Sequence, residues 1–516
     1  MSAHLLPSHS PDGRFSMSVD SADGYGLYQT EKEQSLIERV LQRSYLLLRS
    51  FRYRHGYRPL GPAFAQSRSY RRLLFRLAYY ACVLLSAIFL LVILFSTFFP
   101  SYTDLPPHYS SLRDRVSSSN LPGRGNPRNE TVFIAASLYD PTGQLARGHW
   151  ASSILQLIDL LGEDNVFLSI YENDSGDEGE AALKEFDDRV PCNKSIVYEH
   201  LDLDELPKVI IPGGEGRVKR ITYLAETRNR ALRPLDKSTT RYNKLLYLND
   251  VAFDPVDALQ LLFSTNIDDN GVAQYRAACA VDFINPIKFY DTYATRDIEG
   301  YSMGLPFFPW FSDTGSGQSR KDVIAGKDAV PVRSCWGGMV AFDAQFFQQD
   351  TRTNVKIAGE SLPARFRALQ DENLFWDGSE CCLIHADIQK PPHTDEEDDE
   401  TQDDTGIYMN PFVRVAYDPK TLSWLWTTRR FEALYTLVHN LGDHLVGLPW
   451  FNVRLDEVPG ETVEDEIVVF DEEGAGSLQT VERIARHDAF CGRPGLQVVQ
   501  PREEGKKGWQ TIPMPT

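Results

Sequence analysis

Apolar and polar positions follow two periods in the larger part of the chain. From residue 131 onward, short apolar runs that suit strands alternate with segments whose apolar residues recur at helical spacing. The expected strands are TVFIAASLYD (131–140), NVFLSIYEND (165–174), SIVYEHLDL (195–203), KLLYLNDVAF (244–253) and YRAACAVDFI (275–284). Strands that are apolar throughout and alternate with helices predict a Rossmann-type α/β fold, with a mainly parallel sheet covered on both faces.

Helical spacing is found at WASSILQLIDLLG (150–162), RITYLAETRNRALRPL (220–235) and DPVDALQLLFS (254–264). We expect the second helix to break at Pro234, because proline lacks the N–H of the helical ladder. Asp254 and Pro255 mark the start of the third helix, since these residue types favour the N-cap and the first turn.

One apolar run has a different length. Residues 77–99 are 23 residues without a charge, and a bilayer core needs about 20 apolar residues in a helix. The run lies too far from residue 1 to be a simple cleaved signal peptide. Ten Arg and no Asp or Glu lie between residues 39 and 76, so the positive-inside rule predicts a single-pass type II protein that crosses the bilayer at 77–99.

Composition divides the chain further. Residues 1–76 are expected to be cytoplasmic, disordered at first and then Arg-rich. Pro, Ser and Gly between 100 and 130 predict an extended stem. The α/β domain is expected over 131–455, with an acidic, solvated loop inserted at about 390–407. Residues 456–516 are acidic and contain Gly and Pro, and they are interpreted as a peripheral tail.

The net charge of −19 argues against a nucleic-acid partner, which would require a basic face. Six of the seven cysteines follow the expected span, where an oxidising lumen permits disulfides whose pairing the sequence leaves open. The absence of any Cys-x-x-Cys makes a metal cluster a weak alternative. Asn129, Asn173 and Asn193 begin N-glycosylation triplets in the same part.

Polar residues gather where the expected strands end. The clusters are Tyr139-Asp140, Glu172-Asn173-Asp174, Asn249-Asp250, and Asp282 with Asn285. Any one of them is more simply a turn or a helix cap. Four on one edge of a parallel sheet predict a ligand site, because ligands bind beyond the carboxyl ends of such strands.

Asp250 is the candidate that specifies the chemistry best. A carboxylate at a strand end suits Mg²⁺ or Mn²⁺, which often bridges to substrate phosphates. Arg228 and Asn229, on the preceding helix, are candidates for donor binding, because Arg meets a phosphate with two parallel hydrogen bonds. The alternative is that Asn249 and Asp250 only begin the turn into the next helix.

Two aromatic segments are candidate sugar platforms. Trp336 precedes Gly337 and Gly338, which allow backbone to approach a ligand closely, and Trp310 lies in the aromatic, Pro-rich stretch 300–311. A tight turn over a core tryptophan and a packed loop explain the two segments equally well.

FWDGSECCLIHADI, residues 375–388, carries further candidates. Asp377 or Glu380 could orient an acceptor hydroxyl or act as its base. His385 could be a second metal ligand, although a lone His among apolar residues is more often structural.

Seven segments together resemble a known family: FIAASLYD, NVFLSIYENDSGD, YLAETRNRAL, KLLYLNDVAFDPVDALQLL, the long segment from Tyr275 to Phe311, AVPVRSCWGGMVAFD and SECCLIHADIQ. They resemble the fungal capsule-associated α-1,3-mannosyltransferases, glycosyltransferase family 69, which are also described as polysaccharide export proteins. The resemblance covers about residues 131–455. It implies a GT-A-like fold, a GDP-mannose donor, a divalent metal such as Mn²⁺ and retention of the α configuration.

The resemblance also implies site roles. Asp250 takes the place of an Asp-x-Asp metal motif, although the chain reads Asn249-Asp250-Val251. His385 gains weight as a second metal ligand, while Glu172 and Asn173 fall near the base or ribose of the donor. Asn249, Asp282 and the two glycines are expected to complete the donor site.

The favoured hypothesis is therefore a Golgi type II mannosyltransferase that moves mannose from GDP-mannose to a mannoside hydroxyl. A non-catalytic lumenal factor for polysaccharide assembly or export is the second hypothesis. A glycoside hydrolase comes last. It would use Asp377 and Glu380 about 5 to 9.5 Å apart, but hydrolysis requires no metal and no diphosphate site.

Overall fold

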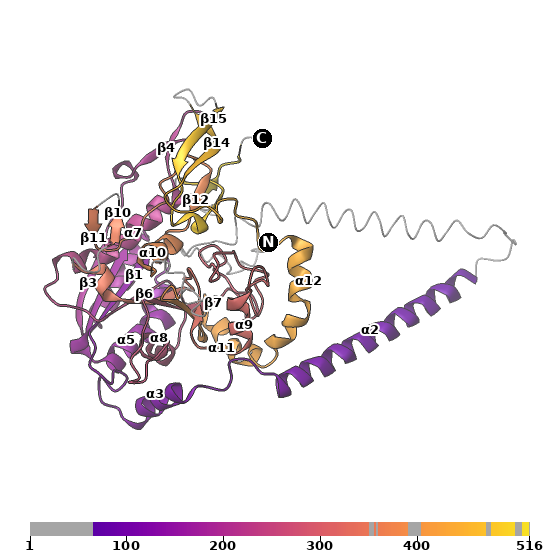
Figure 1. Ribbon diagram of the computed structural model, residues 1–516. Coiled ribbons are helices and arrows are strands. Elements are labelled where there is room, and N and C mark those ends of the chain that lie inside the picture. The colour runs from indigo at the N-terminus through magenta and orange to yellow at the C-terminus, as the bar shows by residue number, and fades with distance from the viewer. Residues whose placement is uncertain are drawn as a thin grey trace, which may run out of the picture.

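The computed structural model describes residues 65–349, 355–357, 360–390, 404–470, 476–500 and 508–514. The predictions for residues 1–64 and for most of the acidic insertion lie outside the described residues. A single α/β domain follows the long N-terminal helix and includes most of the chain (Figure 1).

An eight-stranded sheet forms the centre of this domain. Its order is β3 (Asn193–Tyr198), β2 (Val166–Glu172), β1 (Val132–Leu138), β6 (Lys244–Leu248), β9 (Met339–Asp343), β7 (Ala277–Phe283), β13 (Ile407–Ala416) and β8 (Val330–Pro331). The first four strands run parallel, β9 is antiparallel to both of its neighbours, and β13 is parallel to β7. The predicted Rossmann-type, mainly parallel sheet is confirmed.

Helices cover both faces of the sheet, as predicted. α5 (His149–Leu161), α6 (Gly176–Asp187) and α8 (Pro255–Ser264) pack on one face, and α7 (Arg220–Lys237) and α10 (Glu380–Ile388) on the other. Alternate residues of β6 belong to the two cores. Leu246 and Leu248 face the first set of helices, and Leu245 and Tyr247 face the second.

Helix boundaries agree with the sequence in one case and differ in another. Asp254 caps α8 by accepting the Val256 amide at 2.8 Å, as predicted. The expected break at Pro234 is wrong, because α7 continues to Lys237. Proline costs little there, since few helical bonds remain beyond it at the C-terminal end.

Residues 101–126 do not form an extended stem. Tyr102 and Tyr109 are buried in the main core, and the short helix α3 (Pro107–Ser118) packs beside α8. The Gln260 side chain donates to the Tyr109 carbonyl at 2.9 Å. The aromatic residues in this Pro-rich segment bind it to the domain.

The C-terminal segment is not a peripheral tail. Its strand β16 (Gly492–Pro494) pairs with β12 (Trp376–Gly378), and Val498 in β17 (Gln497–Val499) is fully buried. Cys491 forms a disulfide with Cys382, while a second disulfide joins Cys279 and Cys335. The α/β domain therefore extends well beyond residue 455.

The remaining helices and strands are peripheral to the sheet. They are α4 (Gln144–Arg147), α9 (Gln318–Ile324), α11 (Pro419–Thr428), α12 (Thr436–Val446), β4 (Lys208–Ile210), β5 (Gly216–Val218), β10 (Val355–Ile357), β11 (Glu360–Leu362), β14 (Thr462–Phe470), β15 (Gly476–Ile484) and β18 (Trp509–Thr511). Short 3-10 turns are η1 (Glu163–Asn165), η2 (Leu203–Glu205), η3 (Ala344–Phe347), η4 (Glu432–Tyr435) and η5 (Ala489–Cys491).

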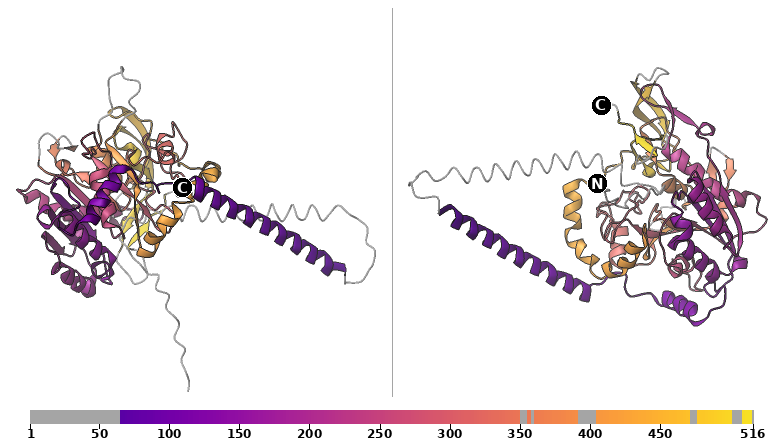
Figure 2. Two further views of the ribbon diagram at one scale, coloured as in Figure 1. Left: turned by 90° about the horizontal axis from the view of Figure 1, so that it is seen from below. Right: turned by 180° about the vertical axis from the view of Figure 1, so that it is seen from behind.

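The helix α2 (Ala65–Phe98) projects from the domain (Figures 1 and 2). An 18-residue window within its part from Arg72 to Phe98 has a mean hydropathy of 2.7, and no residue of that window is buried, although α2 contacts η4 of the domain. By length and composition this helix can cross a bilayer. The chain is thus compatible with a single-pass membrane protein.

Candidate active site

A cleft lies at the carboxyl ends of the parallel strands. It is lined by Ser137, Leu138, Tyr139, Tyr171, Asn173, Leu224, Thr227, Arg228, Asn249 and Asp250. The chain leaves β1 through α5 on one face of the sheet and enters β6 from α7 on the other. The order of strands reverses between β1 and β6, which is where open α/β sheets bind ligands.

Arg228 forms a buried ion pair behind one wall of the cleft. Its Nε donates to Glu380 Oε1 at 2.9 Å, and its Nη1 donates to Asn249 Oδ1 at 3.1 Å. The guanidinium also lies 4.5 Å from the ring centroid of Trp336. The two charged side chains are only 3% and 0% exposed, so each needs the other.

The end of β6 is held rigidly against the next strand. The backbone N–H of Asn249 donates to the Gly338 carbonyl at 2.9 Å, and the backbone carbonyl of Asn249 accepts from Trp150 Nε1 at 2.9 Å. Asp250 follows directly, is half-buried and lines the cleft. This backbone anchoring places its carboxylate at a defined position.

The opposite wall comes from β2. Asn173 is buried, accepts from the Tyr223 hydroxyl and donates to the Glu199 carbonyl at 2.9 Å. Glu172, by contrast, accepts the Ser175 amide at 3.0 Å and does not line the cleft. Asn173 therefore lines the cleft where the predicted donor contact requires it, and Glu172 does not.

Four buried carboxylates lie beyond the Arg228 wall: Asp282, Asp291, Asp377 and Glu380. Asp282 accepts the Asp291 amide at 3.1 Å and the Tyr417 hydroxyl at 2.9 Å, so it does not reach the cleft as the predicted donor ligand would. Burial and repulsion from Asp291 raise the pKa of Asp282, and burial and repulsion from Glu380 raise the pKa of Asp291.

Asp377 and Glu380 are close enough to influence each other. Burial raises the pKa of Asp377 to about 6, and the Glu380 carboxylate adds to this, while Lys219 opposes it from 4.0 Å. Glu380 Oε2 has no hydrogen-bond partner within the part of the chain that the structure describes. Glu380 contacts Arg228, which lines the cleft. A buried carboxylate oxygen without a protein partner in this position is suited to accept a hydrogen bond from bound substrate.

Three predicted donor contacts are structural instead. The Asn229 side chain pairs with the Phe366 backbone in both directions, at 2.8 and 2.9 Å. A Cβ on Gly337 would lie 1.9 Å from the Ala280 carbonyl oxygen, and one on Gly338 would lie 2.7 Å from Val251. The two glycines thus allow close packing of protein on protein, and they position Asn249 rather than a ligand.

Both candidate sugar platforms are buried. Trp336 is 1% exposed between Arg228 and Phe366, and Trp310 is fully buried against Phe283 and Phe308. A ring that is covered on both sides cannot stack on a sugar. The alternative of core tryptophans is the correct one.

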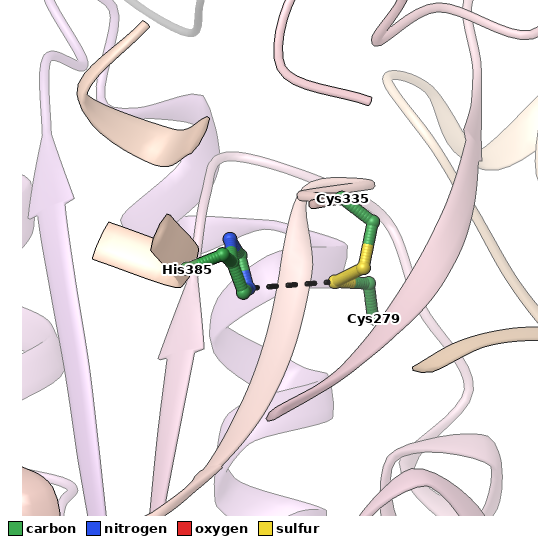
Figure 3. A group of neighbouring side chains, drawn as sticks. All are labelled: Cys279, Cys335 and His385. Carbon is green, nitrogen blue, oxygen red and sulfur yellow. Dashed lines mark hydrogen bonds between the residues drawn. A yellow bond between two sulfur atoms is a disulfide. The ribbon is translucent and has the colours of Figure 1, made fainter. Parts of the chain in front are cut away.

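His385 is not placed to bind a metal beside Asp250. It is fully buried over the middle of the sheet, stacks on Phe342, and its Nδ1 donates to the Cys381 carbonyl at 2.7 Å. Its Nε2 lies 3.9 Å from Cys279 Sγ (Figure 3). This sulfur is already bonded in the Cys279–Cys335 disulfide, so the three side chains form no thiolate metal site.

We expect His385→Phe to keep transfer activity within about threefold, because the ring does not reach the cleft. Burial lowers the pKa of His385 to about 4, so the native state holds it neutral. Between the unfolded pKa of about 6.5 and pH 4, the unfolded chain binds a proton at this residue that the native protein does not. The free energy of unfolding is therefore full above about pH 6.5 and decreases as pH falls from there toward 4. Melting temperatures between pH 7 and 4 should fall less steeply for the variant. An equal slope in both proteins, or lost metal dependence in the variant, would contradict this placement.

The residues lining the cleft suit a hard divalent ion in one respect. Asp250 supplies a carboxylate, whereas the amide oxygens of Asn173 and Asn249 already accept hydrogen bonds from Tyr223 and Arg228. Mg²⁺ and Mn²⁺ commonly take only one or two protein carboxylates and complete their shell with water and substrate phosphates. The donor set therefore fits an ion that arrives with a diphosphate better than a closed protein cage.

Some cleft residues were not predicted. Ser137 and Tyr171 are at the ends of β1 and β2, where the strand-end rule pointed only to the polar residues that follow. Leu224, Thr227 and Arg228 lie at helical spacing on one face of α7, a signal that could have identified Thr227. Outside the cleft lining, Lys219 carried no signal either, because its partner Asp377 is distant in sequence.

Comparisons with known proteins identify a family for this chain. Residues 131–387 match the model of the family described as cryptococcal mannosyltransferase 1. No curated protein matches the chain. Among the solved structures that match is the mannosyltransferase PcManGT from Pyrobaculum calidifontis in complex with GDP-Man and Mn2+, at 13% identity and a TM-score of 0.31, over 71% of this chain and 75% of that one. The chain belongs to the capsule-associated mannosyltransferase family and is a glycosyltransferase that transfers mannose.

Proposed function

We propose that this mannosyltransferase takes mannose from GDP-mannose and transfers it, with retention, to a hydroxyl of a mannose-containing glycan in an α-1,3 linkage. One observation carries the proposal: Asp250 and Arg228 both line the cleft where the strand order reverses, and Arg228 is paired with the buried Glu380. A diphosphate at this edge would meet a carboxylate suited to a metal and lie close to a guanidinium. The linkage and the donor base come from the family resemblance.

Asp250 would hold Mn²⁺ or Mg²⁺, which would neutralise the charge of the leaving diphosphate. Asn173 and Tyr171 form the wall expected to contact the nucleoside. Arg228 stays charged in the protein interior and favours the negative leaving group beside it. Asn249 fixes the guanidinium through the 3.1 Å hydrogen bond.

The transfer breaks the bond from mannose C1 to the diphosphate oxygen and forms one from C1 to the acceptor oxygen, which loses its proton. Glu380 is our candidate to meet the reacting sugar, because its Oε2 is unpartnered among the described residues. Asp377, whose pKa of about 6 lets it exchange protons near neutrality, is our candidate to receive the acceptor proton.

The test uses the full chain in detergent with GDP-mannose, UDP-sugars and a mannobiose acceptor, with and without Mn²⁺. We expect released GDP and an extended glycan in equal amounts, only with GDP-mannose and a divalent ion. GDP-mannose binding without any product would favour a non-catalytic assembly or export factor instead. Product with every ion removed would overturn the metal role and leave the transferase.

We further propose that the protein is a Golgi type II protein whose domain is lumenal. Asn129 and Asn193 are exposed, whereas Asn173 is 2% exposed and hydrogen-bonded on both sides of its amide. We therefore expect glycans at the first two sites and none at Asn173. Deglycosylation followed by peptide mass spectrometry would count them. An unmodified chain from a secretory host would contradict the lumenal placement.

A further inference from the structure

Helix α12 exposes apolar side chains and buries polar ones. Its exposed apolar side chains are Leu437, Val438, Leu441, Leu445 and Val446, and they are 61%, 61%, 64%, 73% and 47% exposed. Its buried side chains are His439 and Asp443. None of its exposed positions carries Asp, Glu, Lys or Arg. A helix on the surface of a soluble domain normally has the reverse arrangement.

The buried polar side cannot rotate outward, because the domain uses it. Asp443 Oδ1 accepts the Leu305 amide at 2.7 Å, and His439 Nε2 donates to the Leu305 carbonyl at 3.0 Å. Arg320 approaches the His439 ring at 3.0 Å. The loop that follows β7 thus fixes α12 with its apolar side outward.

The same region receives the end of the apolar helix α2. Just beyond Phe98, the Ser101 amide donates to the Arg429 carbonyl at 3.0 Å, and its hydroxyl donates to Glu432. Arg429 ends α11, and Glu432 begins the short turn η4 that leads into α12. α12 lies on the side of the domain from which α2 projects (Figures 1 and 2).

Exposed tryptophans flank this junction. Trp424 and Trp426 of α11 are 52% and 44% exposed, and the Arg429 guanidinium lies 5.7 Å from the Trp426 ring centroid. Beyond α12, Phe451 is 76% exposed. Tryptophan beside an uncharged apolar helix is typical of segments that lie in the headgroup region of a bilayer.

We propose that α12 lies in the surface of the same bilayer that α2 crosses, with Leu441 and Leu445 in contact with lipid. The position beside the end of α2 selects lipid as the occupant, because a bilayer around α2 would meet this face of the domain first. The domain is then held at the membrane by two attachments, α2 and α12, instead of standing off on a stem.

The test compares two leucines of equal exposure in the full chain. Cys82→Ser removes the exposed thiol, and Leu441→Cys or Leu478→Cys adds one, at positions that are 64% and 66% exposed. Leu478 is on β15 of the C-terminal hairpin, away from α12 (Figure 1). Each is labelled with an environment-sensitive fluorophore and reconstituted at one copy per phosphatidylcholine nanodisc, with or without nitroxide-labelled lipid.

We expect nitroxide lipid to lower fluorescence at position 441 by roughly twofold or more and to leave position 478 unchanged. Adding Leu445→Glu should restore the emission at 441 and leave mannosyl transfer to a soluble acceptor intact. Equal water exposure at both positions would overturn the proposal. Protection at 441 without lipid quenching would also overturn it, since protein, either α2 or a second copy, would then cover the face. Transfer activity is measured separately, so failure here leaves the proposed reaction standing.

Discussion

Asp250→Asn is expected to lower the rate of mannosyl transfer by about a thousandfold while the domain stays folded. The change keeps the shape of the side chain and removes its charge. Asp250 would hold the metal that neutralises the leaving diphosphate, and losing several kcal/mol of transition-state stabilisation with its carboxylate corresponds to this factor. Asp250 is half-buried at the end of β6, and asparagine has nearly the same volume, so we expect the packing of this strand end to be kept.

Two further measurements make this result specific. Calorimetry should show that Mn²⁺ strengthens GDP-mannose binding in the native protein and no longer does so in the variant. Asp254→Asn is the matched control. Asp254 lies four residues further on, is exposed and only caps α8, so we expect unchanged activity and a stability loss below about 1 kcal/mol. A wild-type rate in Asp250→Asn would refute the metal role of this strand end.

Local pattern predicted the parallel half of the sheet well, because buried parallel strands are apolar along their whole length. β1, β2 and β6 begin and end within their predicted segments. The antiparallel β9 was not predicted, since its five residues follow Gly337 and Gly338, which were interpreted as part of a ligand site or as a tight turn. Apolar pattern carries no information on strand direction or order.

Composition was misleading where a few side chains decide the packing. Residues 456–514 are acidic on average, yet Phe490, Cys491 and Val498 are buried. The segment 100–130 has the Pro and Ser content of a linker, yet Tyr102 and Tyr109 anchor it in the core. A mean over many residues hides such anchors.

The sequence predicted the cleft residues whose position depends on the backbone, but not the surroundings of those whose contacts are distant in sequence. Asp250, Asn249 and Arg228 follow from rules about strand ends and helix faces, and these rules concern the backbone. Whether Trp336 stacks on a sugar or on Arg228 depends on residues distant in sequence, as does the neighbourhood of His385. One-dimensional pattern does not determine such tertiary contacts.

Removing one partner of the Arg228–Glu380 pair should damage both stability and transfer. Arg228→Met leaves an uncompensated carboxylate in a site that is 0% exposed. Breaking a buried pair in this way costs about 3–5 kcal/mol. We expect the melting temperature to fall by roughly 5–10 °C and transfer to fall at least about a hundredfold. Glu380→Gln should destabilise as well, because the guanidinium then lacks its counter-charge.

The double variant separates architecture from chemistry. With both charges gone, Arg228→Met with Glu380→Gln should recover at least about 1–3 kcal/mol relative to the sum of the single changes. Transfer should not recover, because the charge near the diphosphate and the carboxylate near the sugar are both missing. If the double variant regained activity together with stability, the pair would be structural, and the catalytic role of Glu380 would be wrong.

The pair of Arg414 and Glu432 provides the control cycle. It is buried to a similar extent, with side chains 1% and 5% exposed and hydrogen bonds of 2.6 and 2.8 Å, but it does not line the cleft. Arg414→Met with Glu432→Gln should show the same pattern of loss and recovery in melting temperature. Transfer, measured below the melting temperature of each variant, should stay within about threefold throughout. A buried ion pair is costly to break anywhere in the domain, so only the separation of activity from stability distinguishes the pair at the cleft.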